Sequence, residues 1–282
     1  MPVVSVIVPC YNQGHLVDEA VESVLAQTFS DFEIIIVNDG STDEATNRIL
    51  QAYDKPKTTV LHTRNCGLGG ARNNGIRAAQ GKYILPLDAD DRIGSTYLEK
   101  AVRVLEARAD VGIVYCEAEY FGERTGRWEL PAYKFPDILL WNVIFCSALF
   151  RKSDWEQTEG YRANVPAWED HDFWLSIIEL GREVYRIPET LFYYRQTSNS
   201  MIKSVDNDRV RQLFAALFRN HPKLYADNIE FVFSELLRFR EAALEKQALI
   251  ETMENTKLGK LQKALNKLKK MARGSQASRL EA

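Results

Sequence analysis

Closely spaced cysteines are missing from this sequence. Its four cysteines, Cys10, Cys66, Cys116 and Cys146, lie far apart, and no two of them form a CxxC pair. Structural zinc sites and small disulfide-stabilised folds depend on such pairs. The sequence therefore argues against both classes and predicts a protein of a reducing compartment.

Targeting and membrane-spanning segments are missing as well. Met1 leads directly into the apolar residues 3–8, without the basic segment and the small-residue cleavage site of a signal peptide. No apolar run approaches the roughly 20 residues that a helix needs to cross a bilayer. We expect a cytoplasmic protein.

An excess of basic charge is the third absence. The net charge is -3 over 282 residues, whereas nucleic-acid-binding proteins usually carry a basic excess, so no nucleic-acid partner is expected. Hydrophobic residues make up 45% of the chain, which is ordinary for a globular protein. The length suits one large domain, alone or with an appendage.

Short apolar runs alternate with amphipathic stretches through the first half of the chain. The runs predict strands at 5–11, 33–39, 58–63, 83–88 and 111–116, and the stretches between them predict helices at 15–27, 43–53, 68–80 and 96–108. Further strands are predicted at 147–152 and 184–195, and further helices at 168–180, at 207–221 and from 229 onward. This alternation indicates an α/β fold, with a parallel sheet that binds ligands at the carboxyl ends of its strands.

An acidic group follows the fourth predicted strand. Asp88, Asp90 and Asp91 come directly after the apolar residues 83–87. Two carboxylates two residues apart can share Mg²⁺ or Mn²⁺ and leave coordination positions for diphosphate oxygens. The competing interpretation is a solvated acidic loop that caps the helix near residue 96.

Two other loops at the same edge carry polar groups. Asp39 ends the second strand, where its carboxylate can accept a hydrogen bond from a nucleobase or a ribose, although Asp39 and Gly40 also suit a plain turn. The glycine-rich residues 64–73 open a helix and contain Arg72, which can pair with a phosphate or a base or remain a surface arginine. The glycine spacing is a poor match to a dinucleotide-binding fingerprint.

Three carboxylates begin the predicted helix of the second half. Glu169, Asp170 and Asp172 are suited to proton abstraction or to metal contacts. They also suit the first turn of any helix, because acidic groups there complement the helix dipole.

Taken in order, these motifs resemble the family 2 glycosyltransferases of the GT-A fold. The resemblance runs through residues 5–12, 37–43, 65–75 and 88–91 and resumes at 169–170 and 194–196. It implies an α/β catalytic domain with a mostly parallel sheet flanked by helices, followed here by a C-terminal helical extension.

The resemblance also implies roles for individual residues. The donor would be a nucleotide sugar, with UDP-sugars expected because Asp39 can accept the uracil imide proton. Asp90 would be the principal ligand of Mn²⁺ or Mg²⁺, assisted by Asp88, and Asp170 would be the catalytic base, supported by Glu169. The residues expected to bind the nucleotide are Pro9, Tyr11, Asn12, Asp39, Arg72 and Asp88.

The implied reaction is a single displacement that inverts the anomeric carbon, with a saccharide or a lipid-linked molecule as acceptor and cell-surface polysaccharide synthesis as its setting. Gln196 departs from the family, which often has a histidine after the Tyr-Arg pair, so its role as a metal ligand stays open. Two rival functions remain: a nucleotidyltransferase on the same core, and a sugar-nucleotide-binding protein without activity.

The C-terminal part differs in composition from the rest. We expect a catalytic domain at 1–205, a helical extension at 206–256, a basic amphipathic helix at 257–273 and a disordered tail at 274–282. Seven cationic residues and no acid lie between Lys257 and Arg273. The segment from Lys257 to Met271 can contact an anionic membrane at the inner face of the plasma membrane. A short coiled coil and a helix packed on the catalytic domain are the alternatives.

Overall fold

The computed structural model describes residues 1–197 and 206–256. The chain divides into two compact units, Met1–Asp227 and Asn228–Ala282. The predicted basic helix at 257–273 and the tail at 274–282 lie outside the described residues. The candidate site belongs to the first unit.

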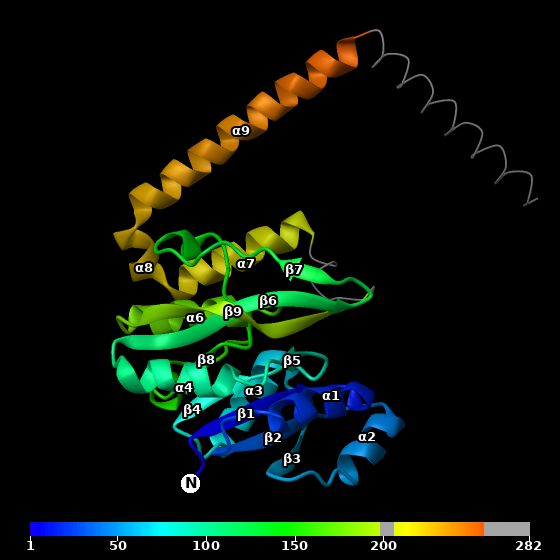
Figure 1. Ribbon diagram of the computed structural model, residues 1–282. Coiled ribbons are helices and arrows are strands. Elements are labelled where there is room, and N and C mark those ends of the chain that lie inside the picture. The colour runs from blue at the N-terminus through cyan, green and yellow to red at the C-terminus, as the bar shows by residue number, and fades with distance from the viewer. Residues whose placement is uncertain (198–205, 257–282) are drawn as a thin grey trace, which may run out of the picture. The chain divides into compact units, whose positions relative to one another are not determined.

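Four parallel strands form the first half of the sheet (Figure 1). They are β1 (Val4–Cys10), β2 (Phe32–Asp39), β3 (Thr58–Thr63) and β4 (Tyr83–Pro86), in the spatial order β3-β2-β1-β4. Every residue of β1 and of β4 is buried, which explains their nearly continuous apolar sequences. The carboxyl ends of these strands meet at one edge, as the alternating pattern predicts.

The second half of the sheet is mixed. The order continues from β4 through β8 (Leu149–Arg151), β6 (Val111–Gly122) and β9 (Glu183–Gln196) to the two-residue β5 (Arg92–Ile93). The short β7 (Gly126–Trp128) pairs with β6 alone. β6 runs parallel to β9 and antiparallel to β8. The α/β class is confirmed, with antiparallel strands joining the parallel half.

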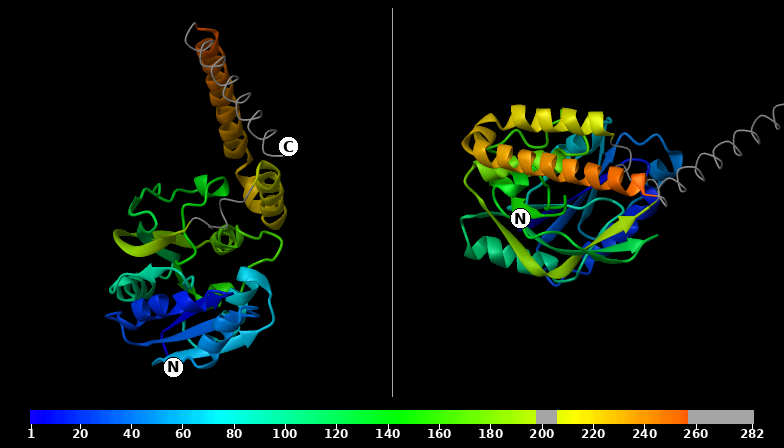
Figure 2. Two further views of the ribbon diagram at one scale, coloured as in Figure 1. Left: turned by 90° about the vertical axis from the view of Figure 1, so that its right-hand side faces the viewer. Right: turned by 90° about the horizontal axis from the view of Figure 1, so that it is seen from above.

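Helices flank the sheet, as the views in Figure 1 and Figure 2 show. In the first half they are α1 (Gly14–Leu25), α2 (Glu44–Gln51), α3 (Gly67–Ala78) and α4 (Tyr97–Ala107). In the second half they are α5 (Lys152–Trp155), α6 (Glu169–Glu179), α7 (Asn207–Asn220) and α8 (Pro222–Asp227), with a 3-10 turn η1 (Asp137–Leu139). A Cβ on Gly75 would lie 2.4 Å from a methyl of Ile7, so only glycine lets α3 pack this closely on β1.

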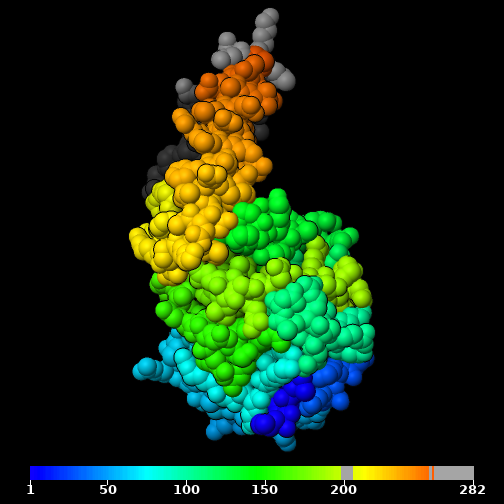
Figure 3. All heavy atoms as spheres, turned by 90° about the vertical axis from the view of Figure 1, so that its left-hand side faces the viewer, coloured from blue at the N-terminus to red at the C-terminus, as the bar shows by residue number. Residues whose placement is uncertain are grey.

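The first unit is packed from two parts of the sequence. In the space-filling view, the blue to cyan residues of the first half and the green residues that follow them each form a continuous mass, and the two pack on one another (Figure 3). Hydrogen bonds join them directly: Lys152 N donates to Lys82 O at 3.0 Å, beside the antiparallel pairing of β8 with β4.

The second unit consists, among the described residues, of α9 (Ile229–Asn255) and Thr256. Several large apolar side chains of α9 are exposed, including Phe233, Leu244 and Met253. Among the described residues, no helix combines the length and the apolar character that a membrane crossing requires.

Candidate active site

Asn12 ties the end of β1 to the loop that follows β2. Its Oδ1 accepts hydrogen bonds from the backbone N–H groups of Thr42 at 2.8 Å and Asp43 at 2.9 Å. Asn12 has a φ of 57°, a left-handed conformation that asparagine tolerates better than most residues. Its neighbours differ in exposure, since Pro9 is buried within β1 and the Tyr11 side chain is 45% exposed. The Asn12 side chain thus fixes the loop after β2 by binding its backbone N–H groups.

Asp39 organises the next loop. The residue is 3% exposed, and its Oδ1 accepts a hydrogen bond from Cys66 N at 2.8 Å, just before α3 begins. Gly40 follows with a φ of 65°, and a Cβ there would lie 2.5 Å from Asn65 N. No group among the described residues donates to Asp39 Oδ2. This carboxylate therefore combines a structural role with an oxygen that is available to a ligand.

Arg72 joins two of the predicted acidic sites. From α3 its guanidinium donates to Asp88 Oδ1 at 2.7 Å and to Glu169 Oε1 at 2.9 Å. The side chain is 1% exposed. Burial lowers the pKa of Arg72, but the charges around it, that of Asp88 first, outweigh burial and raise the pKa. Carboxylates thus bind both terminal nitrogens of the guanidinium. The predicted contact of Arg72 with a nucleobase stays a prediction.

The loop after β4 concentrates negative charge. Asp88 accepts from Arg72 through Oδ1 and from the Cys146 thiol through Oδ2, at 3.4 Å. No side chain among the described residues donates to the Asp90 carboxylate, and burial, then the charge of Asp88, raises its pKa to about 6. The Asp90 carboxylate can therefore serve as a ligand to a cation.

Asp91 has a different function from its two neighbours. It is fully buried, and its Oδ1 accepts a hydrogen bond from Arg195 N at 2.8 Å. Arg195 Nε donates to the carbonyl oxygen of Asp90 at 2.8 Å. These bonds bring the end of β9, with the predicted residues 194–196, next to the acidic loop. Gln196 itself is half-buried there.

Asp170 lies in the first turn of α6. Its Oδ1 accepts a hydrogen bond from the backbone N–H of His171 at 2.7 Å, and its Oδ2 accepts one from Asn142 Nδ2 at 3.3 Å. Burial and then the charge of neighbouring Glu169 raise the pKa of Asp170 to about 7. A carboxylate with such a pKa can accept a proton near neutral pH, which is the property of a general base.

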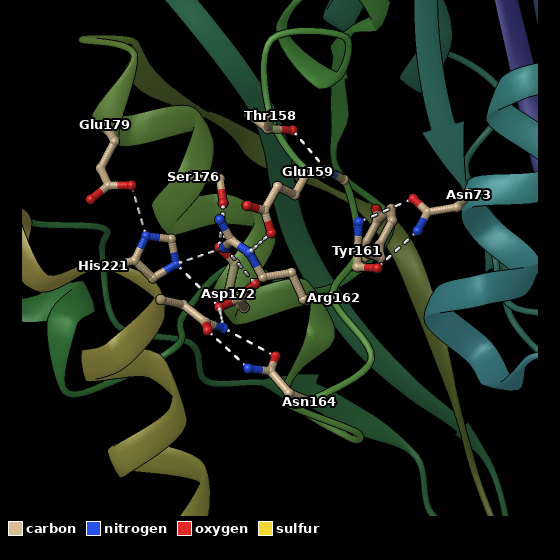
Figure 4. A network of polar contacts seen from close by, with 12 residues as sticks. Asn73, Thr158, Glu159, Tyr161, Arg162, Asn164, Asp172, Ser176, Glu179 and His221 are labelled. Atoms are coloured by element: carbon tan, nitrogen blue, oxygen red, sulfur yellow. Dashed lines mark hydrogen bonds and ion pairs between the residues drawn. The ribbon is translucent and has the colours of Figure 1, made fainter.

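Asp172 points away from this cluster. Figure 4 shows it within a buried network, where Oδ2 accepts from Arg162 at 3.0 Å and Oδ1 accepts from Asn220 at 2.6 Å. His221 Nε2 lies 3.1 Å from Oδ1, and its Nδ1 lies 2.8 Å from Glu179. Asp172 therefore fastens α6 to the end of α7 and belongs to the structural frame of the site.

Sequence reasoning missed three groups of this site. Cys146 and Asn142 come from the long connection between β7 and β8 and contact Asp88 and Asp170. Tyr161 is buried, with its ring centroid 5.5 Å from the Arg72 guanidinium carbon. Asn73 holds Tyr161 by bonding both its backbone N–H and its carbonyl (Figure 4). No motif marks Asn142, Cys146 or Tyr161, whereas Asn73 stands in the motif at 65–75 without a role of its own being predicted for it.

Asp88 and Asp90 of the acidic loop can share one divalent cation. Among the described residues, no group of three or more His, Cys, Asp or Glu side chains is placed to hold a metal by itself. Asp88 and Asp90 supply hard oxygens, and burial, followed by the charge of Asp88, raises the pKa of Asp90. The donor set suits Mg²⁺ or Mn²⁺ completed by oxygens of a bound diphosphate.

Several known proteins are similar to this chain in sequence. The chain is 30% identical over 249 residues to the uncharacterised glycosyltransferase EpsJ of Bacillus subtilis, with 78% of this chain and 71% of that protein covered. It is 33% identical over 214 residues to TuaG of the same species, a putative teichuronic acid biosynthesis glycosyltransferase, with 71% and 81% covered.

Solved structures share the fold. Residues 1–349 of TarS from S. aureus, in complex with UDP-GlcNAc, align with a TM-score of 0.63 at 20% identity, covering 77% of this chain and 66% of that one. The mannosyltransferase PcManGT of Pyrobaculum calidifontis, in complex with GDP-Man and Mn²⁺, aligns with a TM-score of 0.56 at 18% identity, covering 92% and 82%. The model of the family described as Glycosyl transferase family 2 matches residues 5–162. The chain is a member of glycosyltransferase family 2 with the GT-A fold.

Proposed function

We propose that this glycosyltransferase moves a sugar from a UDP-sugar to an acceptor hydroxyl, with inversion at the anomeric carbon and with the help of Mn²⁺ or Mg²⁺. The observation that carries the proposal is the meeting of Asp88, Arg72 and Glu169 in one buried ion-pair chain, with Asp170 next to Glu169. This chain joins the acidic loop after β4 to the first turn of α6. On this proposal, the chain holds the diphosphate-binding carboxylates and the base in one place.

The donor side rests on the loop edge of β1, β2 and β4. Asp39 offers a carboxylate oxygen to a uracil imide, and Asn12 and Pro9 line the strand end beside it. Asp90 and Asp88 would hold the cation, which when bound neutralises the charge that develops on the leaving diphosphate. TarS was solved with UDP-GlcNAc, and PcManGT was solved with GDP-Man and Mn²⁺. Both support a nucleotide sugar as donor, the second supports a cation, and the nucleobase is decided by the experiment below.

Asp170 would act on the acceptor. It takes the proton of the acceptor hydroxyl, whose oxygen bonds to the anomeric carbon from the face opposite the diphosphate. The bond between that carbon and the phosphate oxygen breaks, and its electrons leave with the nucleoside diphosphate. Asn142 orients the Asp170 carboxylate, and Arg72 donates a hydrogen bond to Glu169 beside it. An acceptor in cell-surface polysaccharide synthesis is proposed from the relatives.

The donor assignment is tested by calorimetry with UDP, GDP and ADP in the presence of Mn²⁺. UDP is expected to bind most tightly to the wild type. Asp39→Asn should reduce the preference for UDP over GDP and ADP, because the amide replaces one acceptor oxygen with an NH₂ donor. Equal affinities for the three nucleotides would contradict the role of Asp39. His15→Gln, a change outside this cluster, is the control.

The metal and the reaction are tested together by release of free nucleoside diphosphate from a panel of nucleotide sugars. Turnover should stop in excess chelator and return with Mn²⁺, and Asp90→Asn should abolish it while weakening UDP binding only when Mn²⁺ is present. Full turnover in chelator would refute the metal role. Tight binding of a nucleotide sugar without release, with every acceptor and cation tried, would favour the non-catalytic rival.

A further inference from the structure

Three aromatic side chains form a cluster at the end of the sheet that borders the acidic loop. Tyr120 and Trp128 are stacked, with ring centroids 5.3 Å apart and an interplanar angle of 21°. Tyr194 lies 5.1 Å from Trp128 and 6.3 Å from Tyr120. All three rings are half-buried. We call these residues the aromatic platform.

Strand pairing places the platform on one face of the sheet. Tyr120 of β6 pairs with Tyr194 of β9, and Ala118, two residues earlier on β6, pairs with Trp128 of β7. Because side chains alternate along a strand, these three rings share a face. The strands β6, β7 and β9 lie together in Figure 1.

Buried rings adjoin the platform on the same face of the sheet. Phe145 is 6.3 Å from Trp128 and stacks on Phe192 at 4.2 Å, and these two side chains are 6% and 0% exposed. The inner pair therefore completes the core, while the outer three rings keep part of their surface accessible. Aromatic pairs across strands also stabilise hairpins, but that function alone does not require accessible rings.

The platform is continuous with the proposed active site at two points. Tyr194 precedes Arg195, which bonds to Asp90 and Asp91. Phe145 precedes Cys146, whose thiol donates to Asp88. Successive side chains of β9 point to opposite faces, so the rings are connected to the acidic loop through Phe145 and Cys146, whereas Asn12 and Asp39 lie at the ends of β1 and β2.

Resting on the proposed glycosyl transfer, we propose that Tyr120, Trp128 and Tyr194 bind a saccharide ring of the acceptor. A pyranose ring has an apolar face of C–H groups that packs on an aromatic ring, and its hydroxyls bond to the polar ends of tyrosine and tryptophan. Arg124, whose guanidinium carbon is 4.9 Å from the Tyr120 ring centroid, adds a donor at the rim. The platform therefore recognises a sugar adjacent to the reacting one and selects saccharide acceptors.

The test uses the full chain without donor, on an array of bacterial oligosaccharides and by tryptophan fluorescence with the saccharides that the array selects. Trp128→Leu should lower saccharide affinity about tenfold or more, and Trp128→Tyr should restore most of it, because a second ring replaces the first. Phe218→Leu, which removes an exposed ring on α7, should leave the affinity unchanged.

Circular dichroism and UDP affinity in Mn²⁺ are measured on the same samples. The proposal predicts that Trp128→Leu keeps wild-type values for both, so a loss of saccharide binding is not a loss of fold. It is overturned if the wild type binds no saccharide of the array at millimolar concentration, or if Trp128→Leu binds as the wild type does. A wild type that binds saccharides but not UDP would instead refute the donor assignment.

Discussion

Replacing Asp172 by asparagine is expected to lower the stability of the first unit far more than the same change at Asp170, two residues away. Asp172 is fully buried and accepts hydrogen bonds from Arg162 and Asn220, with His221 Nε2 3.1 Å from the same carboxylate. Burial alone would raise its pKa, but its bonds with His221 and Asn220 outweigh burial and lower it. The network is thus built around an ionised carboxylate (Figure 4).

The magnitude follows from what remains after the change. Asparagine keeps one acceptor oxygen but turns its NH₂ group toward Arg162 or His221. Each of these then loses its buried partner Asp172 and keeps only the more exposed carboxylate of Glu159 or Glu179. Breaking a buried ion pair on one side costs about 3 to 5 kcal/mol. For a unit of this size that corresponds to a fall of roughly 10 °C in the melting temperature. Asp170→Asn, which leaves the bonds from His171 N and Asn142 with an acceptor, should shift it by little.

The assay is thermal and urea unfolding of both variants, followed by far-UV circular dichroism at pH 7. Asp172→Asn should lower the urea midpoint with little change in slope, while Asp170→Asn serves as the control that removes a charge from the same helical turn. A wild-type melting curve for Asp172→Asn would refute the structural role. If that variant were also inactive, the base would be Asp172 and the assignment of Asp170 would be wrong.

Three further outcomes are expected. Asp170→Asn should lower kcat by about 10²- to 10⁴-fold with unchanged UDP affinity; because its pKa is raised to about 7, wild-type kcat should rise as pH increases through about 7, and a flat profile would contradict this role. Burial lowers the pKa of His221, but its bonds with Asp172 and Glu179 outweigh burial and raise it. The stability that the protonated His221 contributes should therefore be lost as pH rises through that raised pKa. The stability of His221→Gln should lack this pH dependence, and identical pH dependence of the variant and the wild type would exclude the role of His221. Truncation after Asn255 removes the cationic residues from Lys257 to Arg273, each contributing about 1 kcal/mol near an anionic surface; co-sedimentation with anionic vesicles should fall, and an unchanged result would reject membrane contact.

The parallel half of the sheet could be predicted because its sequence signal is local. β1, β2 and β4 are mostly apolar runs, whereas β3 is half-exposed and largely polar. Each of the four matches a predicted strand within a few residues, and the helices between them follow an amphipathic period. The acidic loop and the first turn of α6 could be predicted for the same reason, since strand and helix ends position their own side chains.

The rest depended on contacts between distant segments. β6 was predicted to end at Cys116 but continues to Gly122, because its outer half pairs with the end of β9. β5 is two residues long and exists only through its pairing with β9. Asn142 and Cys146 reach the site through a loop without a periodic pattern. The length of β6, the existence of β5 and the positions of Asn142 and Cys146 all depend on contacts between segments that are distant in the sequence.

The two neighbouring carboxylates of α6 illustrate how the fold divides roles between similar residues. Glu169 is 6% exposed and bonded to Arg72, so its charge is balanced and its oxygen is occupied. Asp170 receives only a backbone N–H and the amide of Asn142. Burial, and then the charge of Glu169, raises the pKa of Asp170, whereas the charge of Arg72 lowers it. The contacts thus leave Asp170 as the carboxylate of this pair that is available to accept a proton. Because Arg72 lowers the pKa of Asp170, Arg72→Met should raise the pH at which kcat reaches half its maximum or abolish turnover, and an unchanged pH profile in an active variant would show that Arg72 does not act on the titration of Asp170.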